Sequence, residues 1–191
     1  MAGSSLVSMI DLQNTRRTFL IGIGSLGMGQ MLPQATAQVP GPAHSGSVLG
    51  TGEGEHLLHF RDGGDIFIHA SAANGSTGFA QGTQQVKKGT GIPIHRHFVM
   101  DEAFYVLEGS GTVILNDARH AFGPGSSVLI PKNTWHGLEN PDREVVLLWT
   151  VAPGGLEGFF RETCSAPGAP PKHLSREQIR EIARKYGTEF R

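Results

Sequence analysis

The strongest structural signal is the stretch GTGIPIHRHFVMDEAFYVLEG, residues 89–109. His95 and His97 lie two positions apart, and alternate residues of a strand share one face, so both imidazoles are predicted to point inward. Met100-Asp101 allows a bend, and Glu102 opens the next strand with the same inward parity as Phe104. The stretch therefore predicts two strands that bring two imidazoles and one carboxylate together.

A second stretch, GSSVLIPKNTWHGLEN at residues 125–140, adds a third imidazole. Residues 131–134 are predicted to form a tight turn. His136 follows this turn and is expected to face the other ligands from across a barrel. Three imidazoles and one carboxylate form a nitrogen and oxygen donor set for a divalent transition metal. Four protein ligands around an octahedral ion leave two positions for water, substrate or dioxygen.

The two stretches resemble the two motifs of the cupin superfamily. The first matches the pattern G(x)5HxH(x)3,4E(x)6G at every fixed position. The second matches G(x)5PxG(x)2H(x)3N except at Asn133, where the family usually has glycine. Asparagine is the residue that best tolerates a left-handed backbone after glycine, so the fold is expected to survive this departure. The short interval between the motifs, residues 110–124, is similar to that of small bacterial cupins.

The resemblance implies an all-β fold, the double-stranded β-helix or jelly-roll cupin barrel, and the residue pattern at the end of the chain adds a short C-terminal helical extension. It implies turn roles for Gly89, Gly109 and Gly125. It also implies metal-ligand roles for His95, His97, Glu102 and His136. Glu102 further resembles the catalytic base of dioxygenase-like cupins, which takes a proton from a substrate hydroxyl. Iron, manganese, nickel and cobalt suit this ligand set, with copper and zinc as further options.

The remaining pattern supports a β domain over residues 55–153. Short apolar runs separated by turn signals predict a sandwich or barrel, and no helix is expected between the strands. The predicted strands are 56–60, 65–70, 83–87, 92–97, 102–107, 111–115, 119–122, 127–130 and 145–151. Residues 154–191 form the predicted extension, with a short helix at 156–162. A second helix is predicted to begin after Ser175, whose spacing to Gln178 fits a capping box, and to end near Gly187.

The N-terminal residues are predicted to be an export signal rather than part of the fold. Residues 1–37 contain paired arginines, Arg16 and Arg17, then a glycine-broken apolar stretch and a small-residue cleavage-like site. This order resembles a twin-arginine signal, so we expect the twin-arginine export machinery as a partner and a periplasmic or secreted location. Residues 38–54, rich in glycine, are expected to form a flexible arm.

Composition excludes other classes of function. The 191-residue chain has a formal net charge of −1 and 7% aromatic residues, which disfavours nucleic-acid binding. Its single cysteine, Cys164, excludes an intramolecular disulfide and a cysteine-rich zinc site. The other histidines lack ligand spacing and are expected at the surface or in the core, with no site role: His44, His56, His59, His69, His120 and His173.

Three hypotheses for function remain open. The first is a dioxygenase that acts on an enol, flavonol or diketone chelated to the metal, with Glu102 as the proton acceptor. The second is non-redox chemistry at the same site, by an isomerase, lyase or decarboxylase. The third is a barrel that binds a small ligand without turnover. Phe104 and Trp149 are candidates for an apolar pocket wall, although core packing is the alternative for each. A homodimer is expected from the resemblance.

Overall fold

The computed structural model describes residues 45–191. The predicted export signal at 1–37 and the first part of the predicted arm at 38–54 lie outside these residues. Residues 45–54 are exposed and form no helix or strand. Across the described range, every helix is too short or too polar to span a membrane.

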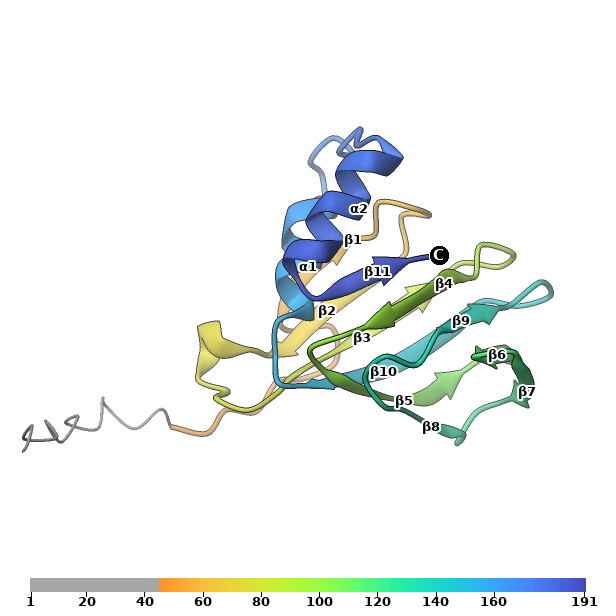
Figure 1. Cartoon of the computed structure of the whole chain (residues 1–191). Coiled ribbons are helices and arrows are strands. Elements are labelled where there is room, and N and C mark those ends of the chain that lie inside the picture. Colours follow the sequence, from red (N-terminus) through yellow and green to blue (C-terminus); the bar gives the residue numbers. More distant parts are fainter. Residues whose placement is uncertain (1–44) are drawn as a thin grey trace, which may run out of the picture. The chain divides into compact units, whose positions relative to one another are not determined.

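Two antiparallel sheets build the domain, and they lie face to face (Figure 1). The first has the strand order β1-β2-β3-β10-β5-β8 and the second has the order β11-β4-β9-β6-β7. The strands of the first sheet are Glu55–Leu58, Asp65–Ala70, Ala80–Val86, Val145–Ala152, Asp101–Glu108 and Ser127–Ile130, given in that spatial order. Those of the second are Thr188–Phe190, Ile92–His97, His136–Glu139, Gly111–Leu115 and Ala118–Phe122.

The core lies between the sheets because the central strands alternate strictly. In β10, Val145, Leu147, Trp149 and Val151 are buried, while the residues between them are not. β3 alternates in the same way along its length. Period-two burial places one face of each strand against the opposite sheet. The expected all-β double-stranded β-helix is confirmed.

The C-terminal segment contains both predicted helices and one strand that was not predicted. α1 spans Leu156–Thr163 and α2 spans Arg176–Lys185, with a capping box between Ser175 and Gln178. Gly187 has a φ of 72°, which turns the chain back after α2. The following residues, β11, then pair with β4.

Two further elements were also missed. β9 is only four residues long, contains Gly137 and has no β-branched residue, so it lacks the usual strand signal. A short 3-10 helix, η1 (Ala72–Asn74), connects β2 to β3. Of these, β9 matters most here, because it carries His136.

Candidate metal centre

β4 directs His95 and His97 into the barrel. Both are buried, while Arg96 between them is partly exposed. The pairing of β4 with β9 is irregular between Ile92 and His95, where Pro93 has no backbone N–H to donate. Irregularities of this kind re-aim side chains beside functional sites. Arg96 forms an ion pair with Glu189 at 2.7 Å, on the opposite side of the strand from the histidines.

The third imidazole enters from β9 and the carboxylate from β5. His136 is the register partner of His95, and a glycine follows it. A Cβ at Gly137 would lie 2.8 Å from the Ile92 carbonyl oxygen, so glycine permits the close approach of β9 to β4. Glu102 lies on β5 of the other sheet, with the inward parity predicted for it. The site therefore joins the two sheets.

All four predicted ligands come together. One donor atom of each of His95, His97, Glu102 and His136 lies within 4.8 Å of the others. His97 Nε2 lies 3.0 Å from Glu102 Oε2, and His136 Nε2 lies 3.1 Å from the same oxygen. The Glu102 side chain is 12% exposed and that of His97 is 2% exposed. The arrangement is compact and shielded from water.

The outer ring nitrogens are held by neighbouring groups. His95 Nδ1 donates to the Pro93 carbonyl at 2.8 Å, and His136 Nδ1 donates to the Thr134 carbonyl at 2.9 Å. His97 Nδ1 lies 2.8 Å from the Thr188 hydroxyl on β11. Partners of this kind fix the ring orientation and present Nε2 as the ligand atom. Thr188 was not predicted, because β11 was not.

One contact shows that the site fits a cation. Since His136 Nδ1 donates to a carbonyl, the Nε2 of a neutral ring presents a lone pair, and this lone pair faces the Glu102 carboxylate. His136 Nε2 is buried and lies only 3.1 Å from Glu102 Oε2. Two facing acceptors require a proton or a metal ion between them. The donor set thus suits a divalent transition ion.

The charge states follow from burial and from the neighbours. Burial, followed by the adjacent His136 and His97, holds the pKa of His95 well below its usual value. Burial alone would raise the pKa of Glu102, but the adjacent His136 and His97 outweigh it and hold that pKa well below its usual range. Burial would lower the pKa of His136, yet Glu102 raises it. Glu102 is therefore an anion at neutral pH.

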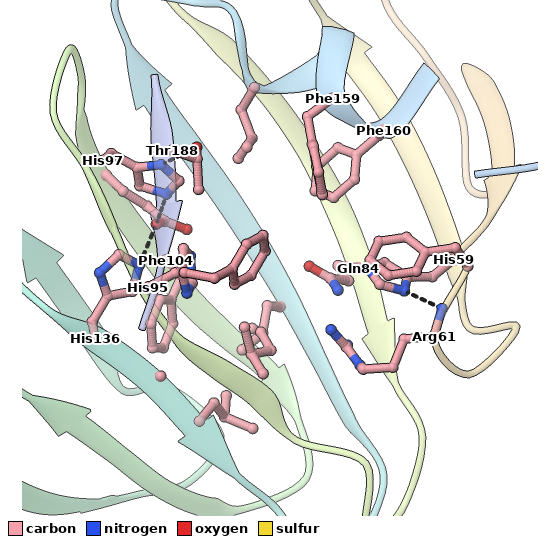
Figure 2. Close-up of a pocket in the computed structure, with 18 residues that line it drawn as sticks. His59, Arg61, Gln84, His95, His97, Phe104, His136, Phe159, Phe160 and Thr188 are labelled. Carbon is pink, nitrogen blue, oxygen red and sulfur yellow. Dashed lines mark hydrogen bonds and ion pairs between the residues drawn. The ribbon is translucent and has the colours of Figure 1, made fainter. Parts of the chain in front are cut away.

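A cavity of about 70 Å³ opens in front of these ligands, with a largely apolar lining. Phe104, a candidate for the pocket wall, lies in this lining and is also buried in the core, and Phe159 and Phe160 of α1 cover another side (Figure 2). Trp149 does not line the cavity. It is buried in the core, with its ring 5.5 Å from that of Phe160. That Phe159 and Phe160 face the cavity was not predicted, because it depends on how the helix packs.

The wall opposite the ligands is polar and was not predicted. His59, Arg61 and Gln84 line it and project towards the cavity (Figure 2). His59, expected at the surface or in the core with no site role, is buried and lines the cavity. Arg61 belongs to the segment Arg61-Asp62-Gly63-Gly64, which carried only a turn signal. Turn residues have no period that would reveal the direction of a side chain.

Two further expectations concern the motif residues. Asn133 has a φ of 67°, which confirms a left-handed backbone at the position where the family usually has glycine. Gly89, Gly109 and Gly125 also have positive φ values and lie outside the strands, consistent with turn roles. Cys164 is buried, and burial raises the pKa of its thiol, so it has no reactive character.

Comparison with known proteins indicates the same family as the two sequence motifs. The family model described as "Cupin domain" matches residues 82–154. Quercetin 2,3-dioxygenase of Bacillus subtilis (strain 168) is 32% identical over 116 residues, which is 60% of this chain and 33% of that protein. This chain thus spans about a third of the length of the dioxygenase.

This chain covers a larger share of two other matched proteins than it does of the dioxygenase. Protein SchB of Streptomyces halstedii is 33% identical over 96 residues, which is 49% of this chain and 69% of that protein. The solved structure of an RmlC-like cupin from Shewanella frigidimarina NCIMB 400 is 19% identical, with a TM-score of 0.49 over 58% of this chain and 94% of that chain. With both motifs in place within the matched domain, the chain belongs to the cupin superfamily.

Proposed function

We propose that this cupin is a metal-dependent dioxygenase that acts on a small enol or diketone. The observation that carries the proposal is the cluster of three imidazoles and one carboxylate at the wall of a mostly apolar cavity. The similarity to a quercetin 2,3-dioxygenase over 116 residues supports the same class of reaction.

The metal would be held by His95, His97 and His136, with Glu102 in reach of both the ion and a substrate. When bound, a divalent transition ion supplies a Lewis acid and a template for oxygen-donor ligands. The outer contacts of the three imidazoles keep their Nε2 atoms directed inward without reorganisation. Iron, manganese, nickel and cobalt are the proposed ions, with copper and zinc as alternatives.

Glu102 is the proposed proton acceptor. Its carboxylate is ionised at neutral pH and lies at the boundary between the ligand cluster and the cavity. A substrate hydroxyl or an enolisable C–H placed there would transfer its proton to Oε2, leaving an electron-rich oxygen substrate. The apolar residues around the cavity exclude water from this charge-separated state.

The size of the cavity favours small substrates within the proposed class. A volume of about 70 Å³ holds roughly two water molecules. Pockets for drug-sized ligands occupy roughly 300 Å³ or more, and a three-ring flavonol is of that size. A short enol or diketone needs much less displacement of Phe159 and Phe160. We therefore rank these substrates above flavonols.

Oxygen uptake tests the proposal. The protein, loaded in turn with each of the proposed ions, is mixed with 2,4-pentanedione in an oxygen-electrode cell. We expect oxygen consumption matched to loss of the diketone with at least one ion. Glu102→Gln should retain folding and lose turnover, and the exposed His120→Ala should behave as the unchanged protein. Substrate loss without oxygen uptake would replace the dioxygenase with the non-redox alternative, and binding without conversion would leave a ligand-binding barrel.

Location and assembly are separate proposals. We propose export through the twin-arginine pathway, because of Arg16 and Arg17, to the periplasm or outside the cell. A double Arg16→Lys, Arg17→Lys variant should accumulate in the cytoplasm, and unchanged export would contradict this.

We also propose a homodimer. Exposed Tyr105, Leu107 and Leu129 on the adjacent strands β5 and β8 support it, and sedimentation equilibrium would test it.

A further inference from the structure

Arg61 carries donors that nothing in the described residues satisfies. Its Nε and Nη2 atoms are buried and have no hydrogen-bond partner there, although the side chain as a whole is 19% exposed. The residue lies between β1 and β2, and its guanidinium faces the cavity (Figure 2). Burial of a charged donor without an acceptor is costly, so the position calls for an acceptor that arrives with a ligand.

The neighbouring carboxylate does not fill this role. Asp62 Oδ2 is 3.8 Å from Arg61 Nη2, beyond hydrogen-bond distance. Its oxygens accept from other groups, namely Gly64 N at 3.1 Å, Lys87 N at 3.1 Å and the Thr90 hydroxyl at 2.9 Å. With a side chain only 1% exposed, Asp62 holds the turn against the following strands. It offsets part of the charge of Arg61 and leaves the donors free.

The groups beside Arg61 add further donors. His59 Nδ1 accepts from the Arg61 backbone N–H at 3.0 Å, so the proton of the neutral ring lies on Nε2. Burial lowers the pKa of His59 to about 3, which keeps the ring neutral at pH 7. Gln84 projects from β3 beside them. Among the described residues that line the cavity, the only carboxylate is Glu102, on the ligand wall.

We propose that Arg61, with His59 and Gln84, is an anion subsite, and that the substrate carries a carboxylate at the end remote from the ligand cluster. Phe104, Leu147 and Phe160 line the space between the two walls and suit a short apolar spacer. A guanidinium binds a carboxylate through charge-assisted, often bidentate, hydrogen bonds. This inference deepens the proposed function. It rests on that function only for the end of the substrate that binds the metal, whereas the carboxylate end rests on Arg61.

The test uses propionate as the probe and propionamide as its neutral isostere. Binding is measured by calorimetry and by the rise in Tm with probe concentration, on metal-loaded and on metal-free protein at pH 7. We expect propionate to bind both forms and propionamide to bind at least about tenfold more weakly. Retention of binding without metal would assign the carboxylate to Arg61 rather than to the ion.

Variants separate binding from a merely structural role. Arg61→Met should weaken propionate binding about 10- to 100-fold, the range for loss of a charged hydrogen-bond donor. Its Tm without probe is measured as a separate readout of folding, because the change removes a buried charge and also the ion-pair partner of Asp62. Arg61→Lys should bind propionate more tightly than Arg61→Met but more weakly than the unchanged protein. Arg119→Met, at an exposed arginine on β7, should bind propionate as the unchanged protein does.

Three results would overturn the subsite. They are equal binding of propionate and propionamide, unchanged propionate binding by Arg61→Met, and propionate binding that disappears with the metal. The first and third require no variant, so they stand even if Arg61→Met fails to fold. None of them bears on oxygen uptake with the neutral 2,4-pentanedione, so failure of the subsite and failure of the dioxygenase proposal are distinguishable.

Discussion

The two walls of the cavity differ in whether their buried polar groups have hydrogen-bond partners. On the ligand wall, each imidazole has its outer nitrogen held, two of them by carbonyls only two residues away. On the facing wall, two donor atoms of the Arg61 guanidinium have no partner among the described residues, while Asp62 accepts hydrogen bonds from two backbone amides and a hydroxyl. One wall is therefore prepared for a cation and the other for an anion.

The largest effect is expected from removal of a metal ligand on the ligand wall. His136→Ala leaves Glu102 beside a vacant position, and we expect metal affinity to fall by more than about 100-fold, since loss of an outer-shell partner alone costs about 10- to 100-fold. Metal content of the purified protein measures this. The control is His120→Ala on β7. A full equivalent of metal in His136→Ala would show that this residue is not a ligand.

Removal of an outer contact on the same wall should have a smaller effect. Thr188→Val keeps the shape of the side chain but removes the hydroxyl beside His97 Nδ1, so metal affinity should fall about 10- to 100-fold. Competition with a chelator measures it. Thr188→Ser keeps the hydroxyl and should bind as the unchanged protein. Equal affinity in Thr188→Val would mean that β11 only packs against the site.

The buried His59 of the facing wall should make the free energy of unfolding depend on pH. The pKa of His59 is about 3 in the fold and near 6.5 when unfolded. Between these values the unfolded chain binds more protons, so the free energy of unfolding falls as pH is lowered. From pH 7 to pH 5 the contribution of His59 is a loss of about 2 kcal/mol.

Denaturant unfolding of His59→Gln at both pH values tests this. The variant should lose less stability than the unchanged protein over the same interval, by about the contribution assigned to His59. His173→Gln, at an exposed position, serves as the matched control and should follow the unchanged protein. Identical pH dependence in His59→Gln would contradict a neutral, buried His59.

The smallest effect is expected at Asn133. Its backbone is already left-handed, so Asn133→Gly should alter stability by less than about 1 kcal/mol and leave metal affinity unchanged. Asn133→Ala should be the more destabilising of the two. Thermal unfolding and metal titration provide the readouts. A large loss on Asn133→Gly would mean that the asparagine side chain itself supports the ligand wall.

The sequence predicted one wall and not the other, for physical reasons. His95 and His97 reveal their direction through the two-residue period of a strand, and His136 through its motif. β9 and β11 lacked a strand signal because one contains glycine and the other has only three residues. Arg61 lies in a turn, where the direction of a side chain is set by how β1, β2 and α1 close over the cavity. Tertiary packing alone brings it opposite Glu102.

Anomalous diffraction from crystals of the metal-loaded protein, grown with propionate, tests the two-walled cavity most directly. We predict one strong peak bonded to Nε2 of His95, His97 and His136, together with carboxylate density at the guanidinium of Arg61. A peak elsewhere, coordination through Nδ1, or propionate seated only on the metal would contradict this arrangement.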